Sequence, residues 1–88
     1  MINITPTQKS ARYTYLTDKG RLFVVVSTDN FIKLTHSLPG NNNSMEILDV
    51  NEGFETEDLV LVLAKLDIEI SYHDADTLKS EFKFFLEF

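Results

Sequence analysis

The sequence contains no cysteine and no tryptophan, and it has only three glycines in 88 residues. The absence of cysteine excludes disulfides, thiolate zinc sites and a cysteine nucleophile, and it favours a reducing, cytoplasmic location. Gly20, Gly40 and Gly53 lie far apart in the chain, so they cannot form a phosphate-binding loop. Motifs for nucleotide binding of that kind are therefore missing.

Long hydrophobic runs are missing as well. The longest uninterrupted apolar segment, Leu59 to Ala64, has six residues, whereas a membrane-spanning helix needs about 20. The N-terminal MINITPTQKSAR lacks the apolar core of a secretory signal. We therefore expect no membrane partner.

The chain does contain enough apolar material for one small core. Hydrophobic residues make up 43% of the sequence and aromatic residues 11%, which argues against wholesale disorder. A chain of this size buries roughly 60 to 65% of its extended surface on folding. We expect a single domain over residues 1–88, with the polar residues 1–10 as a candidate flexible arm.

The segment from Glu55 to Tyr72 carries the clearest helical pattern. Apolar residues recur there at the i, i+3, i+4 and i+7 spacing of one helical face: Leu59, Val62, Leu63 and Leu66. Thr56 is a candidate N-cap, followed by acidic residues that complement the helix dipole, and Lys65 falls in the last turn. This pattern predicts a helix over about 56–66, although the Leu/Val alternation also permits a buried strand from Leu59 to Ala64.

The N-terminal half predicts a β-hairpin. ARYTYLT and RLFVVVS are strand-like runs separated by Asp18, Lys19 and Gly20, a short turn. Tyr13 and Tyr15 fall on one face of the first strand. The second strand, Leu22 to Val26, is apolar at every position, so we expect it to be covered on both faces.

Two interpretations remain open for the next segment. Phe31 to Thr35 predicts a third strand that would extend the hairpin to a meander, whereas Thr28 could cap a short helix over about 29–38. We favour the strand because phenylalanine, isoleucine and threonine are poor helix formers. Pro39 to Ser44 predicts a loop, and MEILDV, residues 45–50, a short strand.

The C-terminal segment also fits two periods. Ile68 to His73 alternates like a strand, and Glu81 to Phe88 contains four phenylalanines, so together they predict a C-terminal hairpin. The helical alternative gathers one apolar face from Leu78, Phe82, Phe85 and Leu86. The expected fold class is therefore α+β: an antiparallel sheet, formed by the N-terminal hairpin or meander and the C-terminal hairpin, with one main helix packed on one face.

Catalytic and metal-binding patterns are weak. His73, Asp74 and Asp76 match no established metal spacing and are typical of a solvated loop, and His36 has no acid or nucleophile nearby in sequence, so we expect an exposed or capping imidazole. The carboxylates Glu55, Glu57 and Asp58 suit a helix N-terminus, where the dipole favours their ionised form. We expect no catalytic residue, no metal, no cofactor and no enzymatic activity.

Charge is distributed very unevenly along the chain. Residues 1–44 contain five bases and two acids, a net charge of +3, whereas residues 45–88 contain twelve acids and three lysines, a net charge of −9. If folding places these halves on different faces, the two faces present opposite potentials to a partner.

The acidic half leads to a functional hypothesis: a small non-enzymatic inhibitor, antitoxin or immunity-type protein, of phage or mobile-element origin. Its carboxylates would imitate DNA and occlude a basic surface on a nucleic-acid-handling protein. The candidate partner-binding residues are Glu46, Asp49, Glu52, Glu55, Glu57, Asp58, Asp67, Glu69, Asp74 and Asp76.

Two alternatives use other residues. A homodimer would form if the predicted C-terminal strand paired with its copy through Phe82, Phe84, Leu86 and Phe88. Single-stranded nucleic acid would bind the hairpin at residues 12–23 through Arg12, Tyr13, Tyr15, Lys19, Arg21 and Phe23. The net charge of −6 makes nucleic acid the least favoured partner.

Overall fold

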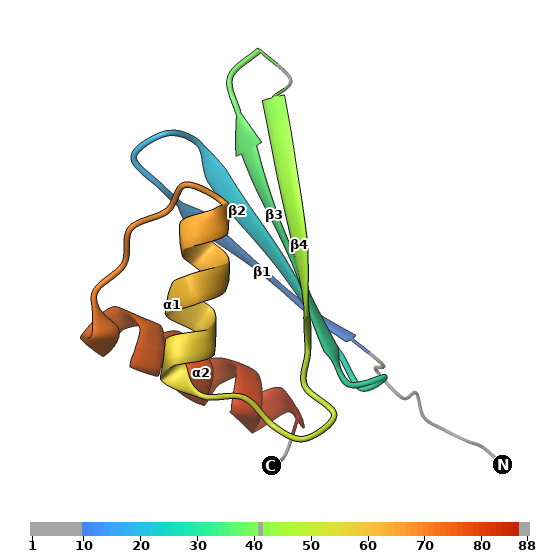
Figure 1. Cartoon of the computed structure of the whole chain (residues 1–88). Helices are drawn as coiled ribbons and strands as arrows, with labels where there is room; N and C mark the ends of the chain where they lie inside the picture. The colour runs from blue at the N-terminus through green and yellow to red at the C-terminus, as the bar shows by residue number, and fades with distance from the viewer. Residues whose placement is uncertain (1–9, 41, 87–88) are drawn as a thin grey trace, which may run out of the picture.

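Four strands followed by two helices make up the fold in the computed structural model, which describes residues 10–40 and 42–86 (Figure 1). The elements are β1 (Ser10–Leu16), β2 (Arg21–Ser27), β3 (Phe31–Leu38), β4 (Asn42–Asp49), α1 (Thr56–Lys65) and α2 (Tyr72–Leu86). The strands form one antiparallel sheet in the order β1-β2-β3-β4. The expected α+β fold class is confirmed.

The predicted N-terminal hairpin is confirmed as β1 and β2. Its strands are in register up to the pair Leu16 and Arg21, and the Thr17 N–H then donates to the Gly20 carbonyl across the turn at 2.9 Å. A Cβ built at Gly20 would lie only 2.0 Å from the carbonyl oxygen of Ser37 in β3. Glycine is therefore needed here because the backbone of β3 approaches so closely.

The segment after this hairpin is a strand, which confirms the meander and excludes the helix over 29–38. β3 pairs without interruption with β2 and with β4, and the alternation of its side chains places Ile32, Leu34 and His36 against the core. β4 already begins at Asn42, so the loop predicted over 39–44 is shorter than expected. The paired backbone of β3 explains this extension, because each added residue gains ladder hydrogen bonds.

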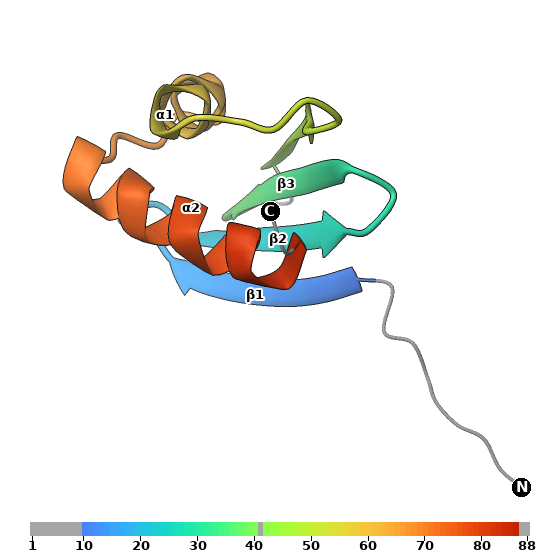
Figure 2. The same ribbon diagram turned by 90° about the horizontal axis from the view of Figure 1, so that it is seen from below.

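The molecule has two layers, because both helices cover the same face of the sheet (Figure 2). The sheet contributes alternate residues to the core, and the helices contribute one face each: Leu22, Val24, Val26, Ile32 and Leu34 from the sheet, and Leu59, Val62, Leu63, Ala75 and Phe82 from the helices. The expectation that β2 is covered on both faces is wrong. Phe23 is exposed on the opposite side, where no described element packs.

The predicted main helix is confirmed as α1, with a different cap. Glu55, not Thr56, is the N-cap residue, and its backbone N–H donates to the Asp58 carboxylate at 2.7 Å. Thr56 is buried instead, and its hydroxyl donates to Asp76 in α2 at 2.9 Å. Asp67 ends the helical segment in a left-handed conformation, with φ of 64°.

The predicted C-terminal hairpin is wrong. Residues 68–70 form a connection without strand pairing, and the chain from Tyr72 to Leu86 is one helix. Ser71 caps this helix, because its hydroxyl accepts a hydrogen bond from the Asp74 N–H at 3.1 Å. The HDAD sequence is therefore the first turn of α2 and not a loop.

This segment forms a helix because the core lies on only one side of the segment. Phe82 is fully buried and packs against Tyr13 with ring centroids 5.4 Å apart, whereas Phe84 is 86% exposed. A strand would have placed Phe82 and Phe84 on the same face, whereas a helix separates them. The candidate flexible arm lies outside the described residues, except for Ser10 in β1.

Candidate functional site

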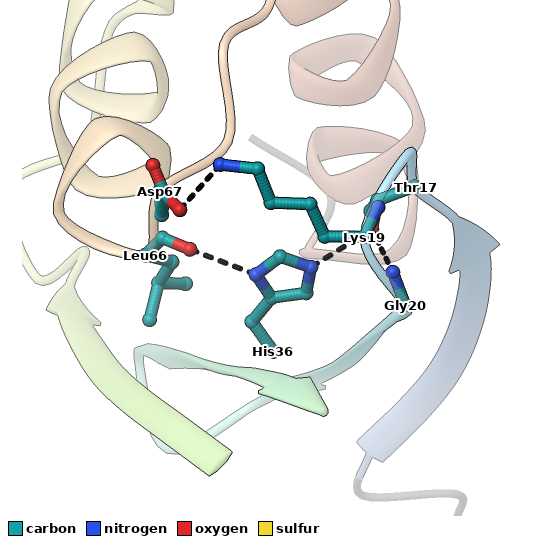
Figure 3. Close-up of polar contacts among 6 residues, drawn as sticks. All are labelled: Thr17, Lys19, Gly20, His36, Leu66 and Asp67. Carbon is teal, nitrogen blue, oxygen red and sulfur yellow. Dashed lines mark hydrogen bonds and ion pairs between the residues drawn. The ribbon is translucent and has the colours of Figure 1, made fainter. Parts of the chain in front are cut away.

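A buried histidine joins three separate parts of the chain (Figure 3). His36 projects from β3 into the core and is fully buried, which corrects the expectation of an exposed or capping imidazole. Its Nδ1 lies 2.8 Å from the Leu66 carbonyl oxygen at the end of α1, and its Nε2 lies 2.8 Å from the Thr17 hydroxyl in the β1–β2 turn.

The chemistry of these partners fixes the direction of each hydrogen bond. A carbonyl oxygen only accepts, so the His36 Nδ1 must carry hydrogen and donate to Leu66. In the neutral imidazole Nε2 then accepts from the Thr17 hydroxyl. The same Thr17 oxygen accepts from the backbone N–H of Gly20 at 2.9 Å, so the turn, β3 and α1 share one polar network.

An ion pair lies beside this network. Lys19 extends past the imidazole toward Asp67, and its Nζ lies 2.5 Å from a carboxylate oxygen (Figure 3). The hydrogen bond from Lys19, together with the positive charge of Lys19, lowers the pKa of Asp67. Both side chains are more than half exposed, so this pair contributes little to stability.

A cavity of about 640 Å³ opens beside the ion pair, at the end of the molecule where the β1–β2 turn meets the end of α1 and the start of α2. Aliphatic side chains form much of its wall: Leu16, Leu22, Leu63, Ile68, Ile70 and Leu78. His36 and Tyr15 complete the wall from the sheet. This volume lies within the range of about 300 to 1,000 Å³ typical of ligand pockets.

The charges around this cavity are mainly negative. Four carboxylates line it, against one amine from Lys19: Asp18, Asp67, Glu69 and Asp74. Near the cavity, the Tyr15 hydroxyl is buried and has no hydrogen-bond partner among the described residues. Burial, and then the negative charge of Glu81, raise the pKa of Tyr15. The cavity therefore combines apolar walls with a surplus of negative charge.

Several of the ten candidate partner-binding carboxylates have structural roles. Glu55 pairs with Lys79 at 3.1 Å, Asp58 caps α1, Asp67 pairs with Lys19, and Asp76 accepts from Thr56. Asp49 accepts from the Asn51 N–H at 2.9 Å.

The remaining candidates fall in different places. Glu69 and Asp74 lie at the cavity together with Asp67, whereas Glu52 precedes α1 and Glu57 lies in its first turn. Glu46 lies on β4 and shares the helix-facing side of the sheet with Leu48. The structure therefore brings three candidates together at the cavity and does not gather all ten into one patch.

A second surface is the face of the sheet that no described element covers, which we call the open face. Strand register and alternation assign to it Arg12, Leu16, Arg21, Phe23, Val25, Phe31, Lys33, Met45, Ile47 and Asp49, with serine, threonine and asparagine between them. Its large apolar residues are partly or strongly exposed, with Leu16 at 81% and Ile47 at 57%. Such apolar exposure is unusual for a solvent-facing sheet and is typical of a contact surface.

The residues predicted for self-association and for nucleic-acid binding are not arranged as expected. Phe82 is buried in a helix, so pairing through a C-terminal strand is not available, and Phe88 lies outside the described residues. Tyr13 and Tyr15 face the helices, whereas Phe23 shares the open face with the cations of the hairpin. The predicted combination of aromatic rings and cations on one surface is therefore only partly present. Phe23 lies on the open face with Arg12 and Arg21, whereas Lys19 reaches toward Asp67 beside the cavity.

The burial of His36 was not predicted, although the sequence carries a signal for it. The predicted strand ended at Thr35, and extending its alternation of Ile32 and Leu34 by one residue places His36 on the apolar face. Its partners Thr17 and Leu66 are 19 and 30 residues away in the sequence, so no local pattern could identify them.

Within residues 10–40 and 42–86, no group of three or more metal-ligating side chains is placed to hold an ion. Neither described helix is long and apolar enough to cross a membrane.

Comparison with models of known protein families, with curated proteins and with solved structures finds no significant match.

Proposed function

We propose that this protein is a non-enzymatic binding module whose acidic helical side docks onto a basic surface of another protein. A partner that handles nucleic acid fits best, because its basic site is built for phosphates, which carboxylates can replace electrostatically. Occlusion of that site would make the protein an inhibitor of the antitoxin or immunity type.

The observation that supports this proposal is the separation of charge between the two sides of the fold. Residues 51–86, which supply both helices, contain nine carboxylates and three lysines, a net charge of −6. The open face carries Arg12, Arg21 and Lys33 against Asp49, a net charge of +2. At physiological salt the Debye length is about 8 Å, so surfaces on opposite sides of a two-layer fold keep distinct potentials.

The expected effect of this charge is on the rate and orientation of association. Long-range attraction between complementary surfaces accelerates encounter and is screened by salt. Carboxylates with structural roles, such as Asp58 and Asp76, add to the field but cannot be replaced without affecting the helices. Glu52 precedes α1, and Glu57 in its first turn contributes only to the helix dipole, so these two are the best positions for a test.

Capture of partners from a lysate with the full chain, at low and at high salt, tests the proposal. The double variant Glu52→Lys/Glu57→Lys should lose capture and should slow association more than it accelerates dissociation. Asp29 is an exposed carboxylate in the β2–β3 turn, and Asp29→Lys is the control for a change of charge on the sheet. Capture that does not depend on salt, or equal loss in the control, would contradict the proposal.

A second candidate function is self-association through the open face and the outer edge of β4. The exposed Met45 and Ile47 favour it, and among the described residues nothing covers this edge of the sheet. Two β4 strands can pair across a two-fold axis to give one continuous sheet.

Sedimentation equilibrium up to high micromolar concentration tests self-association. Ile47→Lys should shift the protein toward the monomer, whereas Leu61→Lys on α1 should not. The side chains of Leu61 and Ile47 are almost equally exposed, at 56% and 57%. The two variants therefore differ mainly in which surface of the protein receives the lysine. A wild-type protein that is monomeric at all concentrations would contradict self-association.

A further inference from the structure

We infer that the cavity between the β1–β2 turn and the two helices binds a lysine or arginine side chain of the basic partner. The site would take a cationic head on an aliphatic stem, and it would anchor the partner at one end of the acidic helical side. This inference rests on the proposed function and adds the group that is recognised.

The walls of the cavity suit an aliphatic stem. Leu22 and Leu63 are core residues that reach the cavity, and Ile68, Ile70 and Leu78 are only partly buried there. Contact with an apolar stem would remove some of this exposed surface from water, which is favourable in proportion to the area covered. The stems of lysine and arginine bury in this way while their charged heads stay close to water.

The charged groups at the cavity suit a cationic head. Its four carboxylates and one amine leave a net charge of −3, so an anionic ligand would be repelled. Glu69 and Asp74 are exposed, and Asp74 also complements the dipole of α2 from its first turn. Neither carboxylate forms a hydrogen bond or an ion pair within the described residues, so both can meet an incoming cation. The Lys19–Asp67 pair is largely exposed and can open at little cost.

The hydrogen bonding of His36 supports an anchoring role for this cavity rather than a catalytic role. Both ring nitrogens of His36 are engaged by Thr17 and Leu66, so the imidazole serves as wall and support. Arginine side chains buried in well-packed pockets are frequent hot spots in protein complexes.

The test uses blocked single amino acids as probes for the partner side chain. The N-acetyl methylamides of arginine, lysine, norleucine and glutamate share one backbone, and norleucine keeps the lysine stem without its charge. Each is titrated into the full-length protein while backbone amide shifts are followed by NMR. Arginine and lysine should shift amides of residues 67–70 and 74–78 in a saturable way, with dissociation constants in the millimolar range.

Variants then test the role of the carboxylates. Glu69→Gln/Asp74→Asn should weaken binding of the arginine probe by about two- to tenfold, the range expected from two exposed charge pairs. Glu52→Gln/Glu57→Gln removes the same charge away from the cavity and should leave probe binding unchanged. Amide spectra of both variants establish that the fold is retained.

Each result bears on the inference. The inference would be overturned if norleucine or glutamate bound as tightly as lysine. It would also be overturned if the saturable shifts lay on the open face, or if the arginine and lysine probes caused no shifts. Salt-sensitive capture of a partner without probe binding would contradict the binding of a cationic side chain in the cavity, and it would leave the proposed function intact. Probe binding without any captured partner would support the cavity and count against the proposed function.

Discussion

The imidazole of His36 donates a hydrogen bond to the carbonyl oxygen of Leu66 at 2.8 Å, and this contact ties the middle of the sheet to the end of α1. Leu66 lies at the C-cap of α1, where backbone carbonyls lack helical partners. The Thr17 hydroxyl on the other side of the ring satisfies the second nitrogen. The cavity is thus supported by a polar network with no unpaired group among these three residues.

Loss of this network should destabilise the whole fold. We expect His36→Ala to lower the free energy of unfolding by about 2–4 kcal/mol, because it leaves the Leu66 carbonyl unpaired and opens space in the core. Urea denaturation followed by circular dichroism measures this change. His73→Ala, at an exposed position, should stay within about 0.5 kcal/mol of the wild type. A double-mutant cycle with Thr17→Val should give a coupling energy between about 0.5 and 3 kcal/mol, and strict additivity would contradict the network.

Gly20 should not tolerate a side chain. The Cβ of Gly20→Ala would lie 2.0 Å from a backbone oxygen of Ser37, so β3 must shift and we expect a loss of about 2–3 kcal/mol. Thermal and urea unfolding measure it. Gly53→Ala is the control, since its Cβ would meet nothing within 4 Å and its φ of 89° adds only backbone strain of about 1 kcal/mol. Equal effects at the two positions would show that β3 does not approach the turn.

Two phenylalanines in α2 should respond very differently to truncation. Phe82→Ala removes a fully buried ring that packs on Tyr13, and it should cost about 3–5 kcal/mol. Phe84→Ala, at an exposed position, should change stability by less than about 0.5 kcal/mol. Denaturant midpoints compare the two variants directly. Similar losses would favour the strand, which places both rings on one face.

Tyr15 should make stability sensitive to high pH. Its pKa is raised in the folded state above the value of 10.0, chiefly by burial, so above pH 10 the unfolded chain loses a proton that the folded chain keeps. The free energy of unfolding should therefore fall as pH rises above 10. Tyr15→Phe should be at least as stable as the wild type at pH 7, because it removes a buried unpaired hydroxyl, and should lose less stability at high pH. Tyr72→Phe, at an exposed position, should keep the wild-type decline.

Prediction from sequence succeeded where a local pattern had a single interpretation. The hairpin around Gly20 and the helix with Leu59, Leu63 and Leu66 on one face are both present, because turn chemistry and the 3.6-residue period act within a few residues. The acidic C-terminal half is likewise a property of composition. Its separation from the cations of the sheet follows from the order of the chain, since the sheet comes first and the helices second.

Prediction failed where two periods fitted the same residues. The segment from Leu78 to Leu86 satisfies both the strand and the helix pattern, and only the position of the core decided between them. With β1 to β4 already forming the sheet, the remaining apolar surface was best covered by a second helix that buries Phe82 and exposes Phe84.

The sequence by itself therefore determined the N-terminal hairpin, the first helix and the imbalance of charge. Only the tertiary structure decided that residues 72–86 form a helix, that no described element covers one face of the sheet, and that His36 meets Thr17 and Leu66 beside an acid-lined cavity. The physical reason is the separation along the chain over which each interaction acts. Turns, caps and periodicity act between near neighbours, whereas a cavity or a buried hydrogen bond depends on residues that only packing brings together.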